Sequence, residues 1–218
     1  MKKKLIVLVL AVTVIASAAI GATLAYFTAK DDATNVFTVG NVKIDLTEPA
    51  WTSAGGGAEQ AATVYPGEAL PKDPTVKNIG ANPCVVRIKI EWPELPTGVD
   101  PIQYRTVYDL GVLGADWYKA DDGYYYYLKP LRIASDPDPL NASLPITTSA
   151  LFTSIVMPRN LGNGDITTKY NVNVKAEAVQ AQGIFPSFAT IRDGISTTGG
   201  ASSELATVQQ FFTTAFKP

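Results

Sequence analysis

The chain of 218 residues has no histidine and only one cysteine, Cys84. Without histidine it has no His-ligated zinc site, no Ser-His-Asp or Cys-His nucleophile, and no imidazole proton shuttle. A single cysteine cannot form an internal disulfide, so Cys84 is either a free thiol or an intermolecular link. Because most common hydrolase chemistry is excluded, we predict a protein that is not an enzyme, with no catalytic residues, no cofactor and no metal site.

Charged residues are also scarce. They make up 17% of the chain, below the usual quarter, so Thr, Ser, Asn and Gly must supply much of the surface, as in extracellular proteins. The 18 basic and 20 acidic residues give a formal charge of −2. Such a chain has no basic field for a phosphate backbone, so nucleic acid is not a predicted partner.

The first 25 residues have the order of a secretory signal: Lys2 to Lys4, an apolar run over 5–22, and then small residues. A retained membrane anchor is the alternative, although the run is near the lower length limit for a spanning helix. Thr23 and Ala25 are short enough for a signal peptidase that cuts between Ala25 and Tyr26. This cut removes three lysines and no acid, so the formal charge falls to −5.

Alternation of apolar and polar residues recurs along the rest of the chain, which is the pattern of antiparallel strands with one buried face. It is clearest over 42–46, 84–92 and 170–178, and 151–157 is a further predicted strand. In the second stretch Cys84 shares its face with Val, Ile and Trp, so we predict that this thiol lies in the core. The fold class is therefore all-β, an antiparallel sandwich.

An Asp-Gly turn at Asp122-Gly123 separates two aromatic segments, 117–118 and 124–128. These are predicted to pair as a hairpin. Its run of four tyrosines allows a second interpretation, stacking on sugar rings, beside the plainer one that they are core and interface residues.

Near the C-terminus the apolar spacing becomes helical. Leu205, Val208, Phe211 and Phe212 follow Ser202 or Ser203, either of which is a suitable N-cap, so we expect a short amphipathic helix within 201–218. The Gly-rich stretch 54–58 is predicted to be a loop. It is not a predicted nucleotide site, because it lacks the following lysine and hydroxyl of a phosphate-binding loop.

Several segments resemble the TasA and camelysin family of secreted Gram-positive matrix-fibre proteins, which have a dedicated signal peptidase of the SipW type. The first two, which surround the expected cleavage site, are Gly21-Ala22-Thr23-Leu24-Ala25-Tyr26-Phe27-Thr28 and Asn35-Val36-Phe37-Thr38-Val39-Gly40-Asn41-Val42. Three more are Tyr65-Pro66-Gly67-Glu68 with Lys77-Asn78-Ile79-Gly80, Asp122-Gly123-Tyr124-Tyr125-Tyr126-Tyr127, and Ala176-Glu177-Ala178-Val179-Gln180-Ala181. The similarity extends from the start of the chain to about Gly183 and is weaker in the last 35 residues.

The resemblance implies a jelly-roll sandwich that is secreted and assembles outside the cell, in the biofilm matrix or at the cell surface, into matrix or pilus-like fibres. Its partners would be further copies of the chain, joined head to tail, the SipW-type signal peptidase, and minor fibre subunits. The chain would contact the membrane only through the uncleaved signal segment. Some camelysin relatives are described as metal-dependent caseinases, but without histidine this chain has no His-Glu-x-x-His helix.

The resemblance also implies a mechanism, in which the freed N-terminal segment of one subunit adds as a strand to the sheet of the next. We therefore divide the chain into a signal peptide (1–25), a donor strand (26–40), a jelly-roll domain (41–200) and the C-terminal helix (201–218). Three predicted anchors of the donor strand enter the neighbour: Phe27, Val36 and Phe37. Two alternatives stay open: segment 26–40 is the first strand of its own domain, or the protein is a monomeric, cell-wall-associated carbohydrate-binding sandwich.

Overall fold

The chain divides into two units, residues 1–39 and residues 40–218. The structure, a computed structural model, describes residues 41–106, 109–162, 170–182, 188–200 and 203–216. Within these residues no helix is both long and apolar enough to cross a membrane. The expected signal segment lies outside them.

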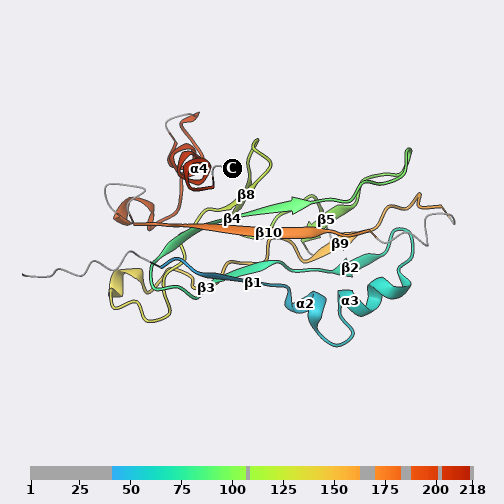
Figure 1. The fold of residues 1–218 in the computed structure, drawn as a ribbon, viewed down its shortest axis with the longest axis horizontal. Coiled ribbons are helices and arrows are strands. Elements are labelled where there is room, and N and C mark those ends of the chain that lie inside the picture. Colours follow the sequence, from blue (N-terminus) through green and yellow to red (C-terminus); the bar gives the residue numbers. More distant parts are fainter. Residues whose placement is uncertain (1–40, 107–108, 163–169, 183–187, 201–202, 217–218) are drawn as a thin grey trace, which may run out of the picture. The chain divides into compact units, whose positions relative to one another are not determined.

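The described part of the chain is mostly antiparallel β-structure in three sheets (Figure 1). One four-stranded sheet has the order β10-β4-β8-β7, a second has the order β2-β9-β5-β6, and β1 pairs with β3. The strands are β1 (Ile44–Thr47), β2 (Ala69–Pro71), β3 (Thr75–Asn78), β4 (Cys84–Glu91), β5 (Gln103–Thr106), β6 (Asp109–Leu110), β7 (Trp117–Lys119), β8 (Tyr125–Tyr127), β9 (Ser154–Val156) and β10 (Asn173–Gln180).

The small β1-β3 sheet continues the layer that contains β2 and β9. The segment 146–151, which leads into β9, bonds to the edge of β3 that β1 leaves free: Asn78 N–H donates to Ile146 O and Thr148 N–H to Val76 O, each at 2.9 Å. As a result β1 is the outermost strand on this side of the layer.

The principal core lies between the layers. Strand β4 contributes every second side chain to it, from Cys84 to Ile90. Val86 and Ile88 are fully buried there, with Phe152 from the opposite layer. Cys84 is buried in the same cluster, as predicted, and burial raises the pKa of its thiol to about 12. The long alternating strands expected around residues 84–92 and 170–178 are β4 and β10, paired over their whole length.

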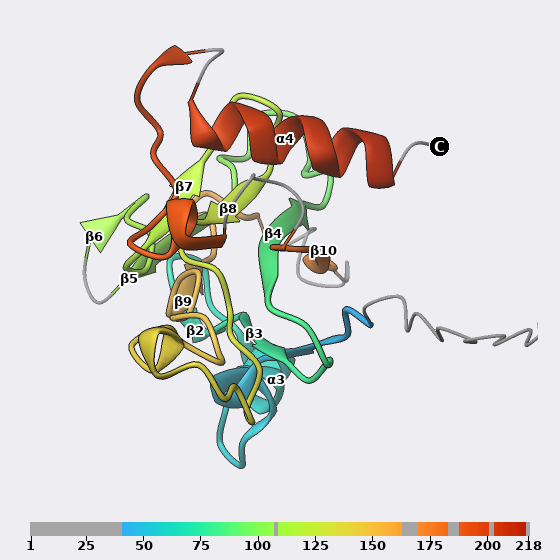
Figure 2. The same cartoon turned by 90° about the vertical axis from the view of Figure 1, so that its left-hand side faces the viewer.

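The C-terminal helix α4 (Glu204–Ala215) covers the outer face of β4 and β8 (Figure 2). Its predicted cap is confirmed, because the Ser203 side chain accepts a hydrogen bond from Ala206 N–H at 3.0 Å. Leu205, Val208 and Phe212 are buried against this face, whereas Phe211 is 39% exposed. The expectation of an all-β protein with a short C-terminal helix is therefore confirmed.

The predicted tyrosine hairpin is also confirmed. Strands β7 and β8 pair antiparallel, with Trp117 opposite Tyr127. Tyr125, Tyr126 and Tyr127 are all buried, as expected of core residues, and Tyr124 is half-buried.

Three short helical segments follow β1: α2 (Pro49–Thr52), α3 (Gly57–Gln60) and the 3-10 helix η1 (Ala61–Thr63). The loop expected over 54–58 is therefore shorter, since α3 begins within it. Gly57 is required where α3 meets β2, because a Cβ there would lie 2.1 Å from Pro71 O and 2.4 Å from the Trp51 ring. The remaining 3-10 helices are η2 (Pro139–Asn141) and η3 (Phe188–Ile191).

A candidate assembly surface

Two edge strands lie next to each other on one side of the sandwich. Among the described strands, β1 hydrogen bonds only with β3, and β10 only with β4. Strands β1 and β10 are in contact but belong to different sheets (Figure 1). An edge strand of this kind is a template on which another strand can pair.

The register of β10 identifies its free backbone groups. Ala181 N–H donates to Pro83 O at 2.8 Å, whereas Cys84, opposite Gln180, bonds to Leu131 on its other side. Since bonded positions alternate along an antiparallel pair, Val174, Ala176 and Ala178 direct their N–H and C=O groups away from β4. Within the described part of the chain these groups have no backbone partner.

The apolar side chains of the two edge strands are only half-buried. On the β1 side they are Val42, Ile44 and Leu46, and on the β10 side Val172, Val174, Ala176 and Ala178, all packed against the principal core. In the adjacent strands Val76 and Ile88 are fully buried. The core is therefore less well covered along this side.

Two adjoining cavities, of about 700 and 610 Å³, follow these edges. They share Glu48, Lys72, Val172 and Asn173. The larger extends under α2, α3 and η1, and the smaller lies between 46–48 and 172–175. We call the strip formed by Leu46–Glu48, Lys72 and Tyr170–Lys175, with both cavities, the edge groove.

A buried ion pair lies where the two cavities meet. Lys72 is 4% exposed, and its Nζ lies 2.8 Å from both carboxylate oxygens of Glu48. The same ammonium lies 4.7 Å from the centre of the Trp51 ring. Helix α2, which carries Trp51, is held to the loop after β2 by Ala50 N–H, which donates to Asp73 Oδ1 at 2.7 Å. Sequence reasoning did not identify this pair, and residues 24 apart in different elements have no local pattern to signal it.

Tyr170 places an unpaired hydroxyl in the larger cavity. Its oxygen is buried and has no hydrogen-bond partner among the described residues. Most buried polar groups in proteins are hydrogen-bonded, and a buried group left without a partner costs about 1–3 kcal/mol. A chain or ligand entering the cavity would find a hydroxyl able to donate or accept.

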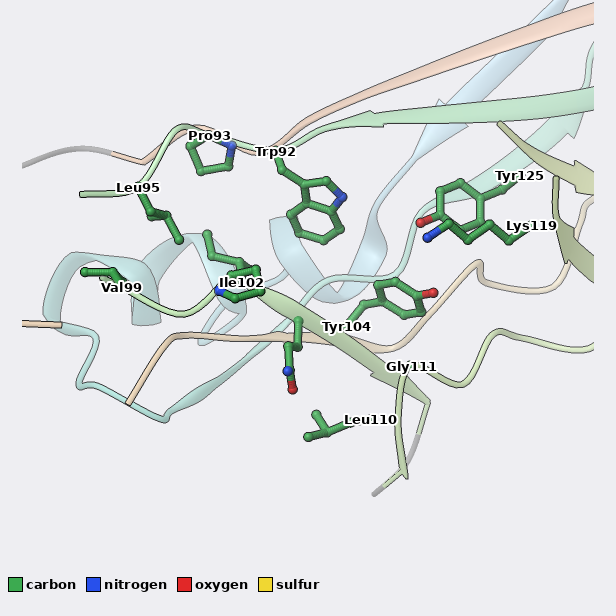
Figure 3. A pocket seen from close by; sticks show the side chains of 12 residues that line it. Trp92, Pro93, Leu95, Val99, Ile102, Tyr104, Leu110, Gly111, Lys119 and Tyr125 are labelled. Atoms are coloured by element: carbon green, nitrogen blue, oxygen red, sulfur yellow. The ribbon is translucent and has the colours of Figure 1, made fainter. Parts of the chain in front are cut away.

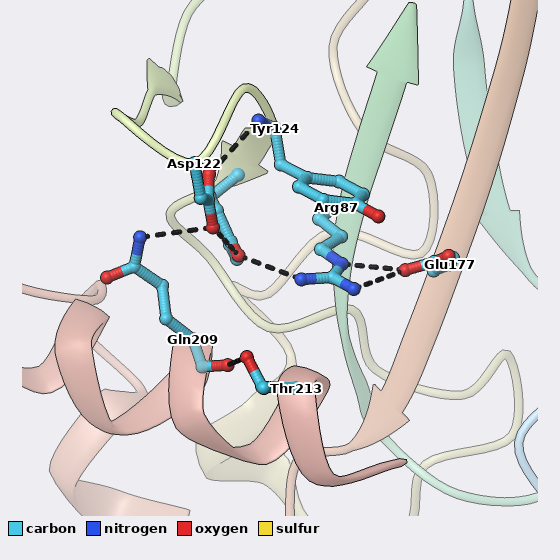
Figure 4. Close-up of polar contacts among 7 residues, drawn as sticks. Arg87, Asp122, Tyr124, Glu177, Gln209 and Thr213 are labelled. Atoms are coloured by element: carbon cyan, nitrogen blue, oxygen red, sulfur yellow. Dashed lines mark hydrogen bonds and ion pairs between the residues drawn. The ribbon is translucent and has the colours of Figure 1, made fainter. Parts of the chain in front are cut away.

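A second polar cluster lies under α4 and holds that helix in place (Figure 4). The Arg87 guanidinium bonds to Glu177 at 2.6 and 2.7 Å and to the Tyr126 hydroxyl at 3.1 Å. Its carbon lies 3.7 Å from the centre of the Tyr124 ring and 4.4 Å from that of Phe212. The Arg87 guanidinium, the Glu177 carboxylate and the Tyr126 hydroxyl bond to one another, so we assign this cluster to helix docking.

A hydrogen-bonded link joins the tyrosine hairpin to α4 in the same cluster. The Tyr126 hydroxyl donates to Asp122 Oδ2 at 2.7 Å, and Gln209 Nε2 donates to the same oxygen at 3.3 Å. Burial raises the pKa of Tyr126, so this phenol stays protonated and can donate at neutral pH.

The residues expected to act in processing and assembly are Ala25 and Tyr26 at the cleavage site and Phe27, Val36 and Phe37 as anchors. All five lie outside the described residues. In the part that is described, no group of three or more acidic or cysteine side chains is placed to hold a metal ion.

Comparison with protein-family models and with curated protein sequences found no match to this chain.

Proposed function

We propose that this chain is a secreted structural subunit, without enzymatic activity, that polymerises into extracellular matrix or pilus-like fibres. Export through a SipW-type signal peptidase would free the segment 26–40. That segment would then pair as a strand along the free edge of β10, beside the edge groove, in the next copy. Within this proposal the domain is a jelly-roll sandwich, and minor fibre subunits are further partners.

The observation that carries the proposal is the juxtaposition of two unpaired edges over a half-open core. Free amide and carbonyl groups on β10 supply main-chain hydrogen bonds, and the half-buried apolar residues of both edges supply a surface for alternate side chains of an added strand. Strand addition uses these two contributions together.

The length of the segment fits the length of the edge. Residues 26–40 span about 50 Å when extended, whereas the eight residues of β10 span about 26 Å. The donor can therefore cover β10 and still leave several residues to bridge two copies. Phe27 and the Val36-Phe37 pair are far enough apart in this segment to lie near its two ends.

Head-to-tail addition is favoured by where the chain enters the domain. Asn41 O accepts from Ala81 N–H at 3.0 Å, so residue 41 lies beside the 79–83 turn, whereas the larger cavity lies beyond the other end of β1, beside α2 and α3. A contact between one end of a subunit and a groove that extends toward the other end is heterologous, so it propagates into a filament unless its rotation closes a ring.

Electron microscopy of two forms of the protein tests this function. The form that begins at Tyr26 should give filaments above a threshold concentration, and the form that begins at Asn41 should stay monomeric. Adding a synthetic peptide of residues 26–40 should block assembly of the first form, because it fills the groove. Fibres from the form that begins at Asn41 would overturn the donor-strand mechanism. Monomers from both forms would overturn self-assembly of this chain.

A further inference from the structure

A separate hollow shares only one described lining residue with the edge groove. It has a volume of about 670 Å³ and is formed by the 92–102 loop with strands β5 to β8 (Figure 3). In their sheet β7 and β8 are separated from β10 by β4, and among the described residues Ile102 alone lines both this hollow and the larger cavity of the groove. A ligand here would not compete directly with a strand added to β10.

The floor of the hollow is aromatic. Trp92 and Tyr104 are half-buried, with ring centres 6.3 Å apart and planes inclined by 16°. The Tyr104 ring also stacks on the buried Phe152, at 5.5 Å, which fixes its orientation. The indole of Trp92, half-buried beside it, is the second aromatic surface of the floor.

Among the described residues, Lys119 is the only one with a charged side chain that lines the hollow. It is exposed, and within the described ranges no carboxylate forms an ion pair with it; its ammonium lies 5.8 Å from the centre of the Tyr125 ring. In Figure 3 Lys119 lies beside Tyr125 at one end of the hollow, and Leu95 and Val99 lie at the other. Polar groups of Gln103 and the Tyr104 and Tyr125 phenols complete the lining.

We propose that this hollow binds a carboxylate-bearing oligosaccharide, with a sugar ring against Trp92 and a uronic carboxylate on Lys119. The apolar face of a pyranose ring packs on an aromatic ring, and its hydroxyls need amide and phenol partners of the kind present here. An unpaired cation beside such a floor favours an anionic ligand, since none of the described residues that line the hollow is acidic and would repel it. This site lies away from the outer face of the tyrosine hairpin.

The test measures binding of the full-length chain to immobilised oligogalacturonate, with neutral maltohexaose and a short polyglutamate peptide as comparisons. We expect binding to the first alone, weakening as salt rises to about 0.5 M because the Lys119 contact is exposed. Lys119→Gln should weaken it about tenfold or more, as expected for loss of a charged hydrogen bond. Lys77→Gln, an equal change of charge at an exposed residue that lines none of the three cavities, should leave it unchanged.

Each other outcome overturns a specific part of the proposal. Equal binding of maltohexaose would remove the role of the carboxylate, and equal binding of polyglutamate would show a general anion site. Absence of binding, or binding that survives Lys119→Gln, would reject the site. Fibre formation should be the same in Lys119→Gln as in the unchanged chain, so failure here is distinguishable from failure of the assembly proposal.

Discussion

The direction of the Ala176 amide allows a sharp test of strand addition at β10. Its N–H points away from β4, so Ala176→Pro should remove a hydrogen bond to an added strand and keep the pairing with β4. The partner carbonyl of the donor would then be buried without a donor, which costs about 1–3 kcal/mol. The concentration needed for fibre formation should rise about 5- to 150-fold.

The assay is sedimentation of fibres over a concentration series, with urea unfolding of the unassembled protein measured in parallel. Ala176→Ser keeps the N–H and should assemble normally. Ala176→Pro should change the free energy of unfolding by less than about 1 kcal/mol, because the edge position tolerates proline. Lys175→Pro should instead destabilise the domain itself, since the N–H at that position faces β4.

An unchanged threshold for Ala176→Pro would refute the assignment of β10 as the acceptor edge. If Ala176 were replaced by proline and the domain lost as much stability as in Lys175→Pro, the Ala176 N–H would have to face β4, which would refute the direction inferred from the register.

Three further predictions concern stability and reactivity. Glu48→Gln should lower the free energy of unfolding by about 3 kcal/mol in a urea titration, because it leaves the buried Lys72 ammonium without its charge partner. Lys175→Gln should leave the unfolding midpoint nearly unchanged, because the Lys175 to Glu91 pair is exposed. Phe212→Ala should cost about 3–5 kcal/mol, and partial proteolysis should then release α4 before the sheets unfold; simultaneous loss of all parts would contradict this. Cys84 should resist a thiol reagent at pH 8 unless urea is added, and fast labelling of the native protein would disprove its burial. Its folded pKa is about 12 against an ordinary 9.0, so the thiol of the unfolded chain ionises first, and the free energy of unfolding should fall as pH rises above 9.

Local patterns were enough to predict the elements whose environment is set by their own sequence. Alternation over 84–92 identified β4 and the burial of Cys84, and the Asp-Gly turn identified the β7-β8 hairpin. Helical spacing with a serine cap identified α4. In each case a periodic face and a boundary signal agree, which is the condition under which local prediction succeeds.

The same patterns gave the wrong environment where a distant element intervenes. By the alternation over 84–92, Arg87 falls on the face opposite Cys84 and the core, where a side chain would be exposed. It is only 5% exposed, because α4, more than a hundred residues later, covers that face. Phe211 follows the apolar spacing of α4 but is partly exposed, since the helix is buried mainly along the stripe of Leu205, Val208 and Phe212. The apolar spacing of a helix does not specify how wide a stripe its neighbour will cover.

The candidate groove could not be predicted from the sequence for a related reason. An edge is a property of sheet order, and nothing within the residues of β10 distinguishes an edge strand from a central one: its alternation resembles that of β4, which pairs on both sides. The difference is in how far the inward side chains are covered. Ile88 on β4 is fully buried, whereas Ala176, its register partner on β10, remains half-exposed.

The half-buried inward face of β10 is relevant to whether segment 26–40 pairs with the next copy (donation) or with its own domain (self-pairing). A segment that folds back as the first strand of its own domain would cover the same half-buried residues and the same free amides as a donated one, so both satisfy the edge equally. They differ in concentration dependence: self-pairing is independent of concentration, whereas donation requires a second copy. If dilution of dissociated subunits leaves the amides of Ala176 and Ala178 protected from hydrogen exchange, the groove is filled by its own chain. Protection that appears only above the fibre threshold establishes donation between copies.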